Sequence, residues 1–371
     1  MTFHISLGAS IRKSVFFDAT VADGAKSFTV YNHMYMPAHF GDPASEYEKL
    51  IHDVAMWDVA AQRQVEIAGP DAETLVRYLT TRDLGQVIPG VGRYVPLCNY
   101  EGSLINDPVL LPIEADRFWF SIADSDIELW SQAIAREKGL DVRISEPDAS
   151  PLAIQGPKAF RLAEALFGSW TRDLRYFHFR EAKLDGIPLL VARSGWSKQG
   201  GFELYLLDHT RGTELYAKVK EAGRPFGIGP GAPGDQERIE SGLLSYGTDC
   251  RHLNHPANPF ELGLGKLVGL DRADDFVGKR ALRRILADGV KRRRTGFIVE
   301  GPAVTANQEA IPILSLGQEV GYISEMVWST RLTQNIATGI IGNQVEDEAS
   351  DLAIMFNGEV RSLTIAALPF I

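Results

Sequence analysis

Strand-like and helical segments alternate along most of this chain, and the alternation stops near Lys291. The period-2 runs at residues 64–68 and 118–122 are each followed by a run with helical periodicity, at residues 70–80 and 127–138. After Lys291 the sequence contains short strand-like runs separated by glycine turns, with few helical signals. The pattern predicts an α+β fold that ends in a small, barrel-like antiparallel β-domain.

The alternation occurs in two successive blocks, which indicates more than one domain. The second block contains predicted strands or helices at residues 152–155, 157–166, 189–193, 202–206, 210–222 and 236–244. Pro147 and Pro151 interrupt the pattern between the blocks, and 371 residues suit two or three domains at about 150 residues each. We therefore predict one α+β domain over residues 1–146, a second over 147–285, and the β-domain over 286–371.

Charge and composition exclude several classes of partner. The 38 Lys and Arg residues against 48 Asp and Glu residues give 38 − 48 = −10, which disfavours binding to nucleic acid or to an anionic membrane. No apolar run approaches the roughly 20 residues that cross a bilayer, and the N-terminus lacks a signal-peptide pattern. Cys98 and Cys250 are too few and too isolated for a disulfide framework. We expect a cytoplasmic protein.

Three further segments have simple structural interpretations. The basic run Lys291-Arg292-Arg293-Arg294 is typical of a solvated linker edge that precedes a strand. Residues 227–231 are rich in glycine but lack the GxGxxG spacing, and they predict a turn that enters a helix. His252 and His255 form the only close histidine pair, and we expect no metal site there.

The segment from Arg193 to Tyr205 has the pattern of a strand, a turn and a second strand. In its last four residues, period-2 alternation places Glu203 and Tyr205 on one face and Phe202 and Leu204 on the other. A carboxylate there can accept two hydrogen bonds from a flat heterocycle. The alternative is a solvent-facing pair on an amphipathic strand, and periodicity alone does not separate the two.

Two other features are candidates for a site. Asp107 stands directly before Pro108, which holds it in an extended conformation at a strand end, either as a turn acid or as a catalytic one. Aromatic residues are the second feature, and those that face a cavity can bind a cationic ligand at about 0.5–2 kcal/mol per ring. They are Phe16, Phe17, Tyr31, Tyr35, Trp57, Tyr94 and Trp196.

Motifs along nearly the whole chain resemble those of the folate-dependent glycine-cleavage T-protein family. Gln155-Gly156-Pro157 and Gly201-Phe202-Glu203 mark the broad family. Asn106-Asp107-Pro108 and the segment 194–203 are more similar to its dimethylsulfoniopropionate demethylase branch. Further matching segments are residues 31–34, 57–59, 69–72, 94–97, 121–126, 237–247 and 258–264.

The resemblance implies a fold and a cofactor. The fold is the three-domain cloverleaf of the T-protein, with a central channel that holds tetrahydrofolate. By matching motif positions, Glu203 would bind the pterin edge, and Tyr205 and Tyr94 would line the cofactor. Asp107 would lie near the reactive folate nitrogens, where it orients N5 or N10 or accepts the proton that N5 loses.

The resemblance also implies a small onium substrate. The reaction would transfer a methyl group from a sulfonium or betaine-like compound to N5 of tetrahydrofolate, with dimethylsulfoniopropionate as the leading candidate. The leaving group is then neutral and needs no general acid. Trp196 and Tyr205, together with Phe16 and Tyr31, are the candidate substrate contacts.

Departures from the family pattern bear on two alternatives, which are aminomethyl transfer in glycine cleavage and a non-catalytic folate-binding accessory role. Where the T-protein has His-Met this chain has Ala61-Gln62, and Gly234 replaces an arginine, which favours a small free substrate. The cysteine motif of the accessory proteins is absent around residues 276–280. Residues 12–17 and 252–257 differ from close demethylases, so the methyl donor stays open, and a homodimer is compatible with the sequence.

Overall fold

The computed structural model describes residues 7–251, 255–347, 349 and 351–371, which form two compact units. Unit 1 combines the described residues up to Gly69 with Val87–Arg93 and Leu110–Gly234. Unit 2 combines Pro70–Gln86, Tyr94–Val109 and the described residues from Asp235 to Ile371. His252, one member of the predicted histidine pair, lies outside the described residues.

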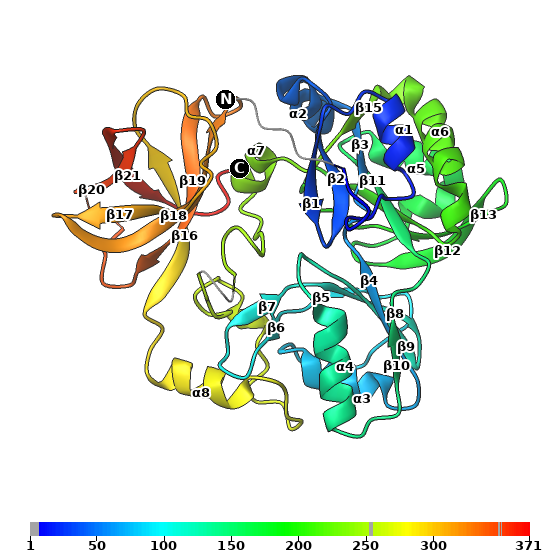
Figure 1. Ribbon diagram of the computed structural model, residues 1–371, viewed down its shortest axis with the longest axis horizontal. Coiled ribbons are helices and arrows are strands. Elements are labelled where there is room, and N and C mark those ends of the chain that lie inside the picture. The colour runs from blue at the N-terminus through cyan, green and yellow to red at the C-terminus, as the bar shows by residue number, and fades with distance from the viewer. Residues whose placement is uncertain (1–6, 252–254, 348, 350) are drawn as a thin grey trace. The chain divides into compact units, whose positions relative to one another are not determined.

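A six-stranded sheet forms the centre of unit 1 (Figure 1). Neighbouring strands are antiparallel, except that β15 runs parallel to β3. Phe202, Leu204 and Leu206 on one face of β14 are buried in the hydrophobic core, which leaves the opposite face to Glu203 and Tyr205. The strand order is β12 (Phe179–Leu184), β13 (Ile187–Ala192), β14 (Gly201–Leu206), β11 (Ser150–Gln155), β3 (Val54–Asp58) and β15 (Ile228–Gly231).

Several helices surround the sheets of unit 1: α2, α5 and α6 contact strands of the six-stranded sheet, whereas α4 packs on a second sheet. Three of them, α4, α5 and α6, confirm the predictions at residues 127–138, 157–166 and 210–222 within two residues at each end. Helix α2 was not predicted; Asp42 caps it by accepting a hydrogen bond from the Ser45 N–H at 3.3 Å. The helices of unit 1 are α1 (Phe17–Ala22), α2 (Pro43–His52), α4 (Ile127–Glu137), α5 (Ala159–Phe167) and α6 (Gly212–Gly223).

A second sheet and two hairpins complete the mixed part of the chain. The five-stranded sheet has the order β10 (Arg143–Ser145), β4 (Gln64–Ala68), β9 (Arg117–Ser121), β8 (Val109–Glu114) and β5 (Arg93–Tyr94). The hairpins pair β1 (Ser27–Tyr31) with β2 (Met34–His39), and β6 (Leu97–Cys98) with β7 (Leu104–Asn106). The bounds of β4 are those predicted from its alternation.

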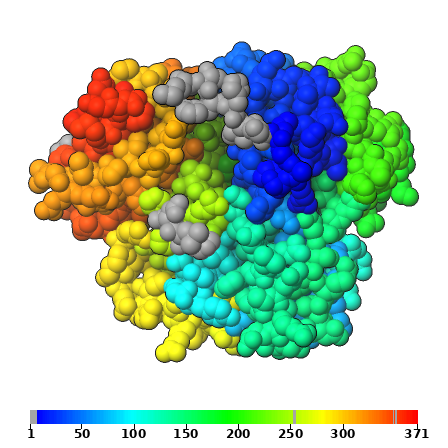
Figure 2. Space-filling model, viewed as in Figure 1, coloured from blue at the N-terminus to red at the C-terminus, as the bar shows by residue number. Residues whose placement is uncertain are grey.

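The residues after Lys291 form a closed barrel of six antiparallel strands within unit 2. Its atoms, orange to red, make one continuous body in the space-filling view (Figure 2). Alternate residues such as Phe297, Ile323 and Leu363 fill its interior. The predicted β-domain is confirmed. Around the barrel the strands are β16 (Arg292–Val299), β19 (Gln334–Gly342), β18 (Gln318–Ser329), β17 (Ile311–Ser315), β20 (Leu352–Phe356) and β21 (Glu359–Ala366).

The remaining helices of unit 2 are α3 (Ala72–Leu79), α7 (Asp235–Glu240) and α8 (Lys279–Ala287). Of these, α3 was predicted, α7 ends earlier than predicted, and α8 was missed. The three predicted domain ranges stay a prediction. The six-stranded sheet takes β3 from the first range and its other five strands from the second, whereas the barrel lies within the third.

The basic run at residues 291–294 is not a linker edge, because β16 already begins at Arg292. The Nε atom of Arg292 lies 2.9 Å from a carboxylate oxygen of Glu261, and Nη2 of Arg294 lies 3.1 Å from one of Asp249. The Arg294 side chain is only 7% exposed. These cations are therefore held by carboxylates of the same unit.

The glycine-rich segment at residues 227–231 was predicted as a turn that enters a helix, and this is wrong. Residues 228–231 form β15, which pairs with β3. A Cβ atom on Gly229 would lie 3.3 Å from the side chain of Lys49, and one on Gly231 would lie 3.1 Å from Nε1 of Trp57. The glycines allow this edge strand to lie against its neighbours.

Candidate functional site

Glu203 lies on β14, where it is paired with Ala153 of β11 and Ala192 of β13. Its side chain is 7% exposed. The Ser194 hydroxyl donates a short hydrogen bond to Oε2 of Glu203, and the Tyr205 hydroxyl donates to the same oxygen at 3.4 Å. Burial raises the pKa of Glu203, while these two hydrogen bonds oppose the rise. Both of these hydrogen bonds end on Oε2.

The prediction that Glu203 and Tyr205 share one face of a strand is confirmed, since their side chains are in contact. The alternative of a solvent-facing pair is wrong, because the two residues are 7% and 1% exposed. Burial, and then the charge of Glu203, raise the pKa of Tyr205 well above its usual value. Ser121 also forms a hydrogen bond with the Tyr205 side chain. Tyr205 therefore supports Glu203 from within the protein, and its 1% exposure leaves almost no surface for the cofactor and substrate contacts predicted for it.

Sequence reasoning missed two neighbours of Glu203. Ser194 lies in the strand–turn–strand segment that the sequence singled out, but no pattern in the sequence marked it as a partner of Glu203. Tyr176 lies close enough that the charge of Glu203 adds to burial in raising the pKa of its phenol, and the residue is 59% exposed. No local pattern marks Tyr176, which lies three residues before the start of β12.

The predicted aromatic substrate contacts differ in their exposure. Trp196 is half-buried in the turn before β14, and Tyr31 is half-buried at the end of β1. Phe16 is 0% exposed and packs in the hydrophobic core of unit 1. Phe16 thus presents no surface to a substrate in this structure, because its ring is used to fill the core.

Asp107 lies in unit 2, directly after β7 and before Pro108, at the predicted strand end. The Tyr94 hydroxyl donates a hydrogen bond to Oδ2 of Asp107 at 2.7 Å. Burial raises the pKa of Asp107 to about 7, Asp249 adds to the rise, and the Tyr94 bond and Arg294 oppose it. A carboxyl group with a pKa near 7 can exchange a proton at neutral pH.

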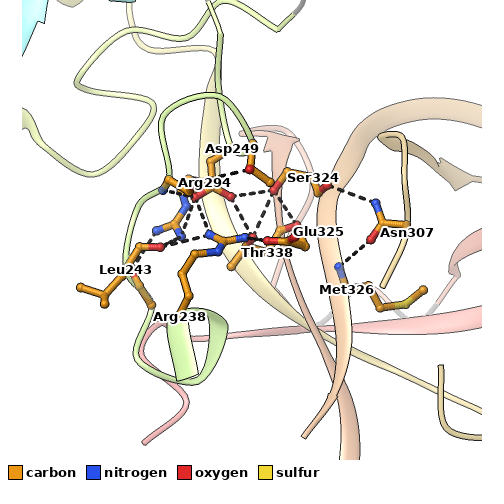
Figure 3. Close-up of polar contacts among 12 residues, drawn as sticks. Arg238, Leu243, Asp249, Arg294, Asn307, Ser324, Glu325, Met326 and Thr338 are labelled. Atoms are coloured by element: carbon orange, nitrogen blue, oxygen red, sulfur yellow. Dashed lines mark hydrogen bonds and ion pairs between the residues drawn. The ribbon is translucent and has the colours of Figure 1, made fainter. Parts of the chain in front are cut away.

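A buried charge network surrounds Asp249 in unit 2 (Figure 3). Its Oδ2 lies 3.0 Å from Nη1 of Arg238 and 3.1 Å from Nη2 of Arg294. Its Oδ1 accepts hydrogen bonds from the hydroxyls of Ser324 at 2.7 Å and Thr338 at 2.9 Å. Burial alone would raise the pKa of Asp249, but the two guanidinium groups hold it well below its usual range. The two guanidinium groups therefore favour the ionised form of Asp249.

A β-bulge in β18 brings two consecutive side chains into the network. The register of β18 against β19 shifts between Ile323 and Glu325. The side-chain amide of Asn307 spans this irregularity (Figure 3). Its Nδ2 donates to the Ser324 carbonyl at 3.1 Å, and its Oδ1 accepts from the Met326 N–H at 2.7 Å. Neighbouring residues of a regular strand point to opposite faces. Because of the bulge, Ser324 and Glu325 both reach the network. Ser324 donates to Asp249, and Glu325 accepts from Arg238, which is also paired with Asp249.

Among the residues that the structure describes, no helix has the length and apolar character needed to span a bilayer. Within the same residues, no three His, Cys, Asp or Glu side chains are grouped as ligands for a metal ion.

Comparison with known families produced two matches. The GCVT N-terminal domain matches residues 16–272, and the glycine cleavage T-protein C-terminal barrel domain matches residues 292–371. The second match coincides with the six-stranded barrel.

Two curated relatives illustrate the range of similarity. The dimethylsulfoniopropionate demethylase DmdA of Ruegeria pomeroyi is 39% identical over 331 residues, which cover 89% of each chain. The aminomethyltransferase of Moorella thermoacetica is 27% identical over 369 residues, which cover 98% of each chain.

A solved structure has the same fold. The crystal structure of glycine cleavage system aminomethyltransferase T from Bartonella henselae matches with a TM-score of 0.82 at 20% identity and covers 98% of both chains. The predicted α+β fold of the T-protein type is confirmed.

Proposed function

Because the chain belongs to the glycine-cleavage T-protein family, we propose that it is a tetrahydrofolate-dependent methyltransferase that demethylates a small sulfonium or betaine-like substrate. Dimethylsulfoniopropionate is the leading candidate. The observation that carries the proposal is the 39% identity to the demethylase, compared with 26–29% to the aminomethyltransferases that were compared.

The residues around Glu203 fit a folate. The Ser194 and Tyr205 hydroxyls both bond to Oε2, and Glu203 keeps 7% of its surface exposed, so we assign Oε1 to the ligand. A carboxylate at this position can accept the paired N–H groups at the edge of a pterin. Ser194 and Tyr205 occupy Oε2 and hold the group in one orientation.

Tetrahydrofolate, when bound, supplies the N5 nitrogen that receives the methyl group. Asp107 can take up the proton released at that nitrogen, because its pKa of about 7 leaves a large ionised fraction at neutral pH. The Tyr94 hydroxyl holds the Asp107 carboxyl in place at 2.7 Å. Neither residue has to protonate the leaving group, since loss of a methyl group turns an onium into a neutral sulfide or amine.

The chain also offers groups that suit a cationic substrate. Trp196 is half-buried, and an indole is the aromatic side chain that attracts a cation most strongly. The net charge of −10 favours the approach of a cation. Most of the rate increase would come from holding the two reactants in line, which can supply about 7–11 kcal/mol.

The test is to incubate the protein with tetrahydrofolate and a panel of methyl donors, and to measure 5-methyltetrahydrofolate. The panel includes dimethylsulfoniopropionate, other sulfonium compounds, betaines and methylated amines. We expect methyl transfer from at least one donor, with Asp107→Asn as the impaired variant. A lack of methylated folate from every donor, together with methylenetetrahydrofolate from an aminomethyl-loaded carrier protein, would establish the alternative reaction.

A further inference from the structure

Gln155, at the end of β11, is 1% exposed, and its side-chain amide bonds to several points of the turn that precedes β14. Its Nε2 donates to the carbonyl of Ser194 at 3.2 Å and to that of Phe202 at 3.4 Å. Its Oε1 accepts from the Ser197 hydroxyl at 2.8 Å. One buried amide therefore connects the start, the middle and the end of this turn.

The chemistry of these partners allows one orientation of the amide. The Ser194 and Phe202 carbonyls can only accept, so the NH₂ group of Gln155 must face them. The Ser197 hydroxyl then donates to the remaining oxygen. A glutamate at position 155 would have the same shape but no donor for the two carbonyls.

The backbone of the turn lies directly on this amide. A Cβ atom on Gly195 would lie 2.1 Å from Oε1 of Gln155, and one on Gly201 would lie 2.7 Å from its Nε2. Both glycines have φ of +151°, which disfavours other residues. The two glycines thus allow the close approach through which Gln155 holds the turn.

The turn carries two groups of the proposed site. Ser194 is held through its carbonyl by Gln155 and donates its hydroxyl to Oε2 of Glu203. Trp196 stands between Ser194 and Ser197, both of which bond to the same amide. We propose that Gln155 is a positioning residue that sets the geometry of the Ser194–Glu203 pair and of the Trp196 indole. This inference rests on the proposed function.

Gln155→Met tests the proposal, because methionine has a similar length but cannot form these hydrogen bonds. Gln199→Met, in the same turn, is the matched control. We expect Gln155→Met to weaken tetrahydrofolate binding about tenfold, to lower kcat/KM for the methyl donor at least as much, and to speed hydrogen exchange of residues 194–202. Gln199→Met should stay within about twofold of the wild type in folate binding.

The measurements separate positioning from simple loss of folded protein. Less folded enzyme would lower the apparent kcat without changing the dissociation constant of folate, so an unchanged constant and unchanged exchange at residues 194–202 would overturn the proposal. If Gln155→Met does not fold, Ser197→Ala decides in the same way, with an expected loss of folate affinity of about threefold. A wild-type protein that binds no tetrahydrofolate would refute the proposed function, while the exchange data would still test the role of Gln155 in the turn.

Discussion

The hydrogen bond between Tyr94 and Asp107 should set the pH at which Asp107 changes charge, and Tyr94→Phe tests this. Burial raises the pKa of Asp107 to about 7, and the 2.7 Å bond from Tyr94 limits that rise by favouring the ionised form. A hydrogen bond to a charged group contributes about 1.5–3 kcal/mol, and 1.36 kcal/mol corresponds to about one pKa unit. Tyr94→Phe should therefore raise the pKa of Asp107 by roughly one to two units.

The assay is kcat/KM for tetrahydrofolate as a function of pH, at a saturating concentration of the methyl donor. For the wild type we expect a decrease below about pH 7 that approaches tenfold per pH unit, because only the ionised Asp107 can accept a proton. The decrease should begin at a higher pH in Tyr94→Phe and be absent in Asp107→Asn, whose remaining activity is low.

A matched control comes from a second buried tyrosine that is bonded to an aspartate. The hydroxyl of Tyr216 donates to Asp23 at 2.9 Å in unit 1, and Tyr216→Phe should leave the pH profile unchanged. The reasoning is refuted if Tyr94→Phe leaves the decrease in place or moves it to lower pH. A flat wild-type profile would mean that Asp107 orients the folate without exchanging a proton.

Three further predictions concern other carboxylates. Burial raises the pKa of Asp58 from 3.8 to about 6, so the folded state loses stability as pH rises through this range. Asp58→Asn should therefore raise the free energy of unfolding in urea by up to about 3 kcal/mol at pH 8 and leave it unchanged near pH 3. An equal rise at both pH values would contradict this. Asp249→Ala leaves the buried Arg238 without this partner and should cost about 3–5 kcal/mol in the same assay, whereas a loss below about 1 kcal/mol would contradict it. Glu203→Gln should weaken tetrahydrofolate binding about tenfold in calorimetry without lowering stability, and wild-type affinity would exclude its proposed role.

Local sequence patterns predicted much of the framework. The alternation in β14 placed Glu203 and Tyr205 on one face, and the proline after Asp107 marked a strand end, because both follow from the backbone geometry of neighbouring residues. The same patterns failed for residues 291–294. A run of arginines resembles a solvated edge unless its partners are known, and Asp249 is distant in sequence from Arg294.

The sequence by itself therefore determined the family and the order of most strands and helices, and it predicted roles for Glu203 and Asp107. Only the tertiary structure decided what surrounds them. Antiparallel pairing of β11 with β14 places Gln155 opposite Gly201, beside the turn that carries Ser194. Burial placed Phe16 in the core and raised the pKa of Asp107. Strand periodicity depends on adjacent residues, whereas burial and hydrogen-bond partners depend on residues that meet only when the chain folds.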